Sequence, residues 1–141
     1  MNAVFSAGVK YTRQHEDGTL KRVTEFFIVP AISFTDVEAK LTEEMAQRTK
    51  GEFLVSSIKR TNYQYVLTNE EDEGTFYHAT ISYKMEDEDS KKKIKINFLI
   101  ETSDIEKVHG IIKNQMEGTI ADFEVIKVEV STVMHVIEDN L

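Results

Sequence analysis

The chain has 141 residues, of which 40% are hydrophobic, and a formal net charge of −8, so it can bury one ordinary core or two small ones. Its acidity argues against a generally basic nucleic-acid coat, and the absence of cysteine excludes disulfides, thiolate catalysis and thiolate metal sites. No apolar run approaches the roughly 20 residues that span a bilayer, and the stretch MNAVFSAGVKYTR has no basic segment before its apolar residues. We therefore expect a cytoplasmic protein with no membrane segment.

The first half of the chain predicts strand, turn, strand, helix and long strand. Residues 5–11 alternate between apolar and polar side chains, and Asp17-Gly18 suits a tight turn before a second strand through TEFFIV. Ser33 or Thr35 can cap a helix, and Gly51 is a stop signal after it. The apolar stripe of this helix contains Phe34, Val37, Leu41 and Met45.

The second half repeats this order. At a shift of 72 residues Phe5 meets Tyr77 and Phe26 meets Phe98, and at a shift of 70 Phe53 meets Phe123. The second helix follows Ser103 or Asp104 and ends before Gly118, and its stripe matches the first at a shift of 71: Ile105, Val108, Ile112 and Met116. Ordered matches of this kind indicate an internal duplication.

The last segment of each half is too long for one strand. Residues 52–67 and 122–137 run about 16 residues each, against a usual 5–6. Their apolar pattern also changes phase by one residue, as from Phe123 and Val125 to Val128 and Val130. Because such a slip moves side chains to the other face, we expect a bulge or kink, with each segment serving as two strands or bending across two sheets.

These patterns predict an α+β protein. It is strand-rich, with β-β-α-long β used twice, antiparallel sheets, two helices covering one sheet face each, and a pseudo-two-fold relation between the halves. We expect a single domain over residues 1–141, with repeat halves 1–71 and 72–141. The negative charge is uneven, because the first half carries −1 and the second −7, much of it in the turns NEEDEG and MEDEDS. We interpret these as solvated turns.

The segments KRVTEFFIVPAISFTDVEAKLTEEM, GEFLVSSIKRTNYQYV and GTIADFEVIKV resemble an uncharacterised domain-of-unknown-function family of Bacteroidetes bacteria and their phages or mobile elements. The resemblance covers nearly the whole chain and implies one compact domain, with no activity that could be transferred. The layout of four strands and then a helix, used twice, is also similar to that of PUR-repeat and Whirly single-stranded DNA-binding proteins. This second likeness is one of topology only.

Catalysis has little support in the residue pattern. The chain has no G-x-S-x-G, P-loop or G-x-G-x-x-G motif, and its four histidines show no i, i+4 pairing that would suit zinc. We therefore expect no catalytic residues, no metal and no cofactor, and a protein that is not an enzyme.

The most suggestive stretch is IKRTNYQY, residues 58–65. Basic side chains there can meet phosphates, while two tyrosines two residues apart can stack on bases. We predict a surface for single-stranded nucleic acid, DNA or RNA, formed by Lys59, Arg60, Tyr63, Tyr65, Arg22 and Lys95. The competing interpretation is that the tyrosines pack in the core and the lysines merely solubilise edge strands.

The leading functional hypothesis is therefore a non-catalytic protein of phage or mobile-element type that binds single-stranded DNA. The alternative is a protein-interaction module, either a homodimer or an inhibitor or adaptor of a larger enzyme, with no nucleic-acid contact. Long strands with exposed edges favour pairing between subunits, so a homo-oligomer is expected under either hypothesis. Salt dependence distinguishes the two, because polyanion binding weakens steeply with salt.

Overall fold

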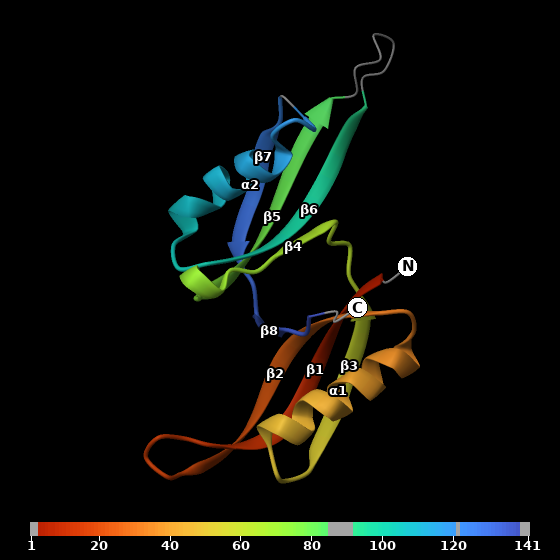
Figure 1. Cartoon of the computed structure of the whole chain (residues 1–141), viewed down its shortest axis with the longest axis vertical. Coiled ribbons are helices and arrows are strands. Elements are labelled where there is room, and N and C mark those ends of the chain that lie inside the picture. The colour runs from red at the N-terminus through yellow and green to blue at the C-terminus, as the bar shows by residue number, and fades with distance from the viewer. Residues whose placement is uncertain (1–2, 85–91, 121, 139–141) are drawn as a thin grey trace. The chain divides into compact units, whose positions relative to one another are not determined.

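The computed structural model describes residues 3–84, 92–120 and 122–138 (Figure 1). Within these ranges the chain forms eight strands and two α-helices, so the predicted α+β class is confirmed. The predicted acidic turn at residues 85–90 lies outside the described ranges. The elements are β1 (Ala3–Gln14), β2 (Leu20–Ala31), α1 (Phe34–Arg48), β3 (Phe53–Arg60), β4 (Tyr65–Leu67), β5 (Thr75–Lys84), β6 (Lys93–Thr102), α2 (Val108–Met116), β7 (Glu124–Val130) and β8 (Val133–Val136), with 3-10 turns η1 (Glu70–Asp72) and η2 (Ile105–Lys107).

The chain groups into two compact units. The first contains Met1–Asn62 together with Val133–Leu141, and the second contains Tyr63–Thr132. In its described residues, each unit has one four-stranded sheet and one α-helix. The strand order is β3-β1-β2-β8 in the first sheet and β4-β6-β5-β7 in the second.

The first unit is built around the hairpin of β1 and β2. Gly18, with φ of 84°, makes the tight turn between them. α1 begins where the side chain of Ser33 accepts a hydrogen bond from the backbone N–H of Asp36. Its buried stripe packs against one face of the sheet, and the core of this unit contains Val37, Leu41, Met45, Phe5, Val9, Phe27 and Val29.

The second unit repeats these pairings. Ala7 lies opposite Phe27 in the first sheet, and Ala79 lies opposite Phe98 in the second. The predicted match of Phe26 with Phe98 is therefore wrong by one residue, and Phe27 is the equivalent. Because Phe26 and Phe27 are adjacent, the sequence pattern fits either of them facing the core, and only the strand pairing shows which one does.

Each long segment divides as expected. Residues 53–67 form β3 and β4, and residues 124–136 form β7 and β8. The register shifts opposite Gly8/Val9 in the first sheet and opposite Thr80/Ile81 in the second, which makes Ser56 and Ile126 the extra residues of two bulges.

The second part of each segment joins the sheet of the other half. β8 pairs with β2 and β4 pairs with β6, and both of these pairs are parallel, whereas the remaining strand pairs are antiparallel (Figure 1). The exchange explains why a C-terminal strand belongs to the first unit.

The predicted helix stripes are correct except at their first residues. Val37 and Leu41 on α1, and Val108 and Ile112 on α2, are at most 1% exposed. Phe34 is 55% exposed and Ile105 46% exposed, so both expectations of burial were wrong. Phe34 is the first residue of α1, with its ring edge-on to that of Phe5 at 5.4 Å between centroids, and Ile105 lies in η2, before α2 begins. Neither described helix is both long and apolar enough to cross a membrane.

Candidate binding sites

A buried carboxylate lies in the core of the first unit. Glu25 on β2 is 2% exposed, and its oxygens accept hydrogen bonds from Tyr11 at 2.5 Å, from Arg13 at 3.1 Å and from His135 Nε2 at 3.1 Å. A carboxylate only accepts hydrogen bonds, so Nε2 of His135 carries the hydrogen. His135 lies on β8, and this contact therefore ties the exchanged strand to the first unit.

The hydrogen bonds and burial of this network change the pKa values of Glu25 and Tyr11. Burial acts to raise the pKa of Glu25, but the hydrogen bonds from Tyr11 and His135 overcome it and hold that pKa below its ordinary value. Burial, followed by the hydrogen bond to Glu25, raises the pKa of Tyr11 to about 12. At neutral pH Glu25 is therefore a charged carboxylate and Tyr11 a neutral phenol.

The equivalent place in the second unit has different residues. Tyr83 corresponds to Tyr11, but Ile96 stands where Glu25 would be, because Val9 pairs with Glu25 and Ile81 with Ile96. Tyr65 corresponds to His135. Each pairs with the equivalent phenylalanine and its ring lies against it, Tyr65 4.9 Å from Phe98 and His135 4.7 Å from Phe27 between centroids.

The helices also end differently. α1 continues one turn beyond Met45 to Arg48, whose guanidinium lies 5.4 Å from the ring centroid of Phe27. α2 ends at Met116, the equivalent of Met45, and Gly118 follows it with φ of 82°. A positive φ suits glycine and ends the helix. The second unit therefore has no counterpart of the final turn of α1.

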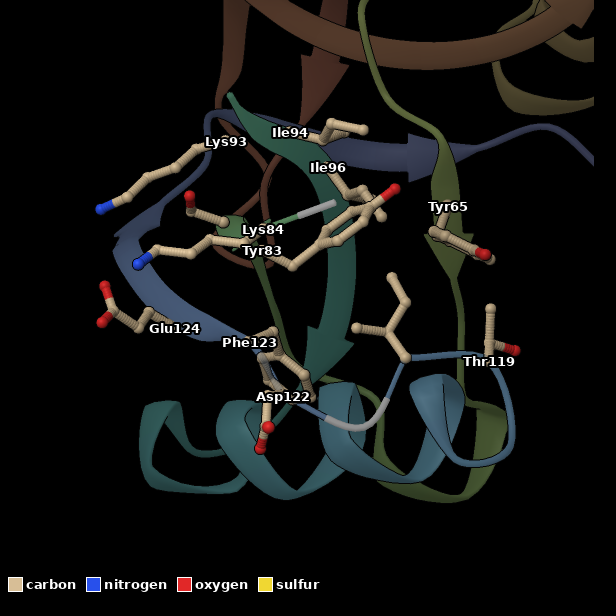
Figure 2. Close-up of a pocket in the computed structure, with 12 residues that line it drawn as sticks. Tyr65, Tyr83, Lys84, Lys93, Ile94, Ile96, Thr119, Asp122, Phe123 and Glu124 are labelled. Atoms are coloured by element: carbon tan, nitrogen blue, oxygen red, sulfur yellow. The ribbon is translucent and has the colours of Figure 1, made fainter. Parts of the chain in front are cut away.

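A cavity of about 1020 Å³ lies in this part of the second unit (Figure 2). Its lining is apolar and aromatic on one part and polar or charged on another, and Figure 2 shows Tyr65, Tyr83, Ile94, Ile96 and Phe123 around it. The charged side chains that line it are Lys84, Lys93, Asp122 and Glu124, and in the figure Lys84, Lys93 and Glu124 extend together to one side. A hollow that combines apolar and aromatic walls with polar groups can hold a small molecule.

A second candidate surface is the face of the first sheet opposite α1, here called the open face. Strand alternation places Lys10, Arg22 and Lys59 on this face. Their strand partners are Thr24, Thr12 and Ser6 respectively, and none of these partners belongs to the core. All three are exposed. Among the described residues of β1, β2, β3 and β8 that alternate to this face, none is acidic.

An aromatic ring lies among these cations. Phe26 is half-buried and pairs with Gly8 on β1. A Cβ atom built on Gly8 would lie 3.2 Å from Cε1 of Phe26 and 2.9 Å from the hydroxyl of Ser57. The missing side chain of Gly8 therefore leaves room for the edge of the Phe26 ring over β1.

The corresponding face of the second sheet carries charges of both signs. Lys95 and Glu124 both pair with Ser82, on opposite sides of β5. Glu129 contacts Lys127 at 3.0 Å and Nδ1 of His78 at 3.2 Å. Glu129 is the equivalent of Lys59, so the duplication has reversed the charge at this position.

The structure does not gather the six predicted residues on one surface. Lys59 and Arg22 share the open face, whereas Arg60 pairs with Phe5 on the opposite face, with its guanidinium 5.8 Å from that ring centroid. Tyr63, Tyr65 and Lys95 belong to the second unit. Both tyrosines are half-buried, Tyr65 against Phe98 and Tyr63 edge-on to His78 at 5.4 Å.

The sequence reasoning missed Phe26 and the cavity, and the six predicted site residues did not include Lys10. The signal for the cavity was in the mismatches of the repeat, where Ile96 replaces Glu25 and Thr119 replaces Arg48 at a shift of 71. Among the described residues, no group of three or more histidine or acidic side chains could hold a metal ion.

Comparison with known proteins assigns the chain to a family but indicates no activity. A family described as a domain of unknown function (DUF4494) matches residues 3–139, and the chain belongs to that family. No curated protein and no solved structure was found to match it.

Proposed function

We propose that this protein is a non-catalytic binding protein for single-stranded nucleic acid, and that the open face of the first sheet is the binding surface. The observation that carries the proposal is the arrangement of Lys10, Arg22 and Lys59 around Phe26 on a face without acidic strand residues. Cations neutralise phosphates, and an aromatic ring offers a surface on which any base can stack. Binding of this kind tolerates sequence variation.

The spacing suits an extended strand. Lys59 lies opposite Ser6 and Arg22 opposite Thr12, six residues apart along β1. At about 3.4 Å per residue this separation is roughly 20 Å along the sheet. A flexible single strand can follow such a path and meet Phe26 between the two cations. The expected similarity in layout to PUR-repeat and Whirly proteins, the mobile-element origin and the cytoplasmic location remain predictions.

Fluorescence anisotropy with labelled oligothymidylate and oligouridylate tests this function. We expect wild-type binding at low salt that weakens steeply as salt rises. The pair Lys10→Gln/Lys59→Gln should weaken binding at least tenfold and reduce the salt slope by about 1–2, roughly one for each lost phosphate contact. Phe26→Leu should weaken binding by about 1–3 kcal/mol through lost stacking.

A matched control uses cations away from the open face. The pair Lys50→Gln/Lys113→Gln changes the net charge by the same amount, and both residues are exposed. It should bind almost as wild type does. No binding at low salt, or equal losses from the two pairs, would reject the open face as the site.

A protein partner is the second candidate function, because of the exposed edge of the second sheet. β7 is an edge strand, and Ile126 and Val130 on it are 47% and 64% exposed. Exposed aliphatic side chains on an edge strand favour pairing with another chain. Light scattering across a concentration series should then detect a dimer that salt does not dissociate and that Val130→Lys does. A monomer at all concentrations would reject the homodimer.

A further inference from the structure

The cavity of the second unit has a counterpart in the first unit that the chain fills with its own side chains. In the first unit this place contains Glu25 and its three hydrogen-bond donors, with Arg48 of the last helical turn nearby on Phe27. In the second unit the equivalents of Glu25 and Arg48 are Ile96 and Thr119, and both line the cavity. The replacements remove charge and volume together.

We propose that this cavity binds a small organic anion with an apolar, preferably aromatic, body. The body would lie among Tyr65, Tyr83, Ile96 and Phe123, which line the cavity (Figure 2). Isoleucine in place of glutamate removes a buried charge that an apolar body would desolvate, and the missing helical turn leaves the space for that body. A volume of about 1020 Å³ is ample for such a molecule, since small-molecule sites typically have roughly 300–1,000 Å³.

The sign of the ligand charge follows from two lysines. Lys84 and Lys93 lie directly opposite each other on β5 and β6, and both line the cavity. Like charges in directly opposite positions destabilise a strand pair, so an anion between them relieves a repulsion that the fold already contains. Asp122 and Glu124 also line the cavity, and Figure 2 shows Glu124 extending to the same side as the two lysines, so the bound anion competes with a carboxylate of the chain for them. The anionic group is placed at the lysines, with the apolar body inside.

A series of probes with the same body and different charges tests this site. The probes are 2-naphthoate, 2-naphthylmethanol and 2-naphthylmethylammonium, titrated into the ¹⁵N-labelled full chain and followed by amide shifts. We expect saturable shifts at Tyr83, Ile96, Thr119 and Phe123, with 2-naphthoate binding at least tenfold more tightly than the other two. Shifts outside the cavity, no saturation, or equal affinity for the three probes would overturn the proposal.

Two sets of variants separate the body from the charge. Lys84→Gln/Lys93→Gln should reduce the affinity for 2-naphthoate at least fivefold and leave that for 2-naphthylmethanol unchanged, whereas Lys21→Gln/Lys50→Gln should change neither. Tyr65→His/Ile96→Glu copies the residues of the first unit into the second and should abolish binding of all three probes. If this variant does not fold, Ile96→Phe, which fills the cavity without adding charge, provides the same test. Unaltered binding after either filling would overturn the proposal.

Discussion

Glu25 is the residue at which the two halves of the chain differ most in chemistry. It is a buried charge that three side chains satisfy, and one of these, His135, comes from the exchanged strand β8. Its equivalent Ile96 needs no partner. A single position thus decides whether this part of a unit contains a polar network or an apolar cavity, because a buried carboxylate without donors would cost several kcal/mol.

Replacement of Glu25 by glutamine should destabilise the protein by about 1–3 kcal/mol, because three hydrogen-bond donors lose a charged acceptor that is itself buried. Urea denaturation at neutral pH measures this loss. The pKa of Glu25 is lower in the folded state than its ordinary value, so its contribution is present above the unfolded value and is lost as the pH falls toward the folded one. The difference between variant and wild type should therefore shrink below about pH 4.5.

Glu38→Gln on the exposed side of α1 serves as the control for this prediction. It should change stability by less than about 0.5 kcal/mol, as is usual for a surface position. A Glu25→Gln variant as stable as this control would show that the network contributes little.

At the scale of the element, the two helices share a stripe but not a length. α1 has 15 residues and α2 has 9. Both are held to their sheets by three buried residues at the same spacing, Val37, Leu41 and Met45 on α1 and Val108, Ile112 and Met116 on α2. The extra turn of α1 adds Arg48, whereas the turn after α2 leads the chain away at Gly118.

The loss of stability on truncating a stripe residue should depend on how buried that residue is, and not on its place in the apolar pattern. Leu41→Ala and Ile112→Ala remove fully buried side chains and should each cost roughly 2–5 kcal/mol. Phe34→Ala and Ile105→Ala act at residues that are about half exposed and should each cost about 1 kcal/mol or less. Thermal or urea unfolding of the four variants measures these differences. Equal losses at Phe34 and Leu41 would contradict the packing described above.

Two glycines in and after α2 should respond oppositely to alanine. Gly110 lies inside the helix with nothing within 4 Å of a built Cβ, so Gly110→Ala should stabilise by about 0.4–1 kcal/mol. Gly118 has φ of 82°, where a side chain is strained, so Gly118→Ala should destabilise by roughly 1 kcal/mol. The pair can be measured in one set of unfolding curves. Stabilisation by Gly118→Ala would show that α2 can extend without strain.

At the scale of the whole molecule, neither half of the sequence is a complete unit. The first unit needs β8 from the C-terminus, and the second needs β4 from the end of the first half. β8 contributes the parallel pairing with β2, the ring contact of His135 on Phe27 and one donor to Glu25. The exchange therefore makes the stability of the first unit depend on the last residues of the chain.

A chain that ends after Thr132 should lose much of the stability of its first unit. Amide hydrogen exchange should show the protection of β2, at Ile28 and Val29, falling by at least about 2 kcal/mol, because β2 becomes an unprotected edge. Protection in β5 and β6 should change little, since all strands of their sheet remain. A uniform loss across both units would contradict this prediction, and so would no loss in either.

Sequence periodicity by itself determined the secondary structure and the duplication. Alternating strands, two one-sided helix stripes and the phase change that marks a bulge are local patterns, because side-chain direction follows chain position at a fixed period. The repeat shifts also predicted the equivalence of Phe5 with Tyr77, as the paired strands show. The same patterns indicated that each long segment serves as two strands.

Only the tertiary structure decided which face of a strand each residue takes, whether the first apolar residue of each helix stripe is buried, and which charged residues share a surface. Phe26 and Phe27 are adjacent, and strand pairing alone assigns one to the core and the other to the open face. Lys59 and Arg60 are neighbours in sequence but lie on opposite faces, and Lys10 joins Lys59 through a strand pairing some 50 residues away. A surface is made by pairing between distant segments, whereas a single sequence records only its local periods.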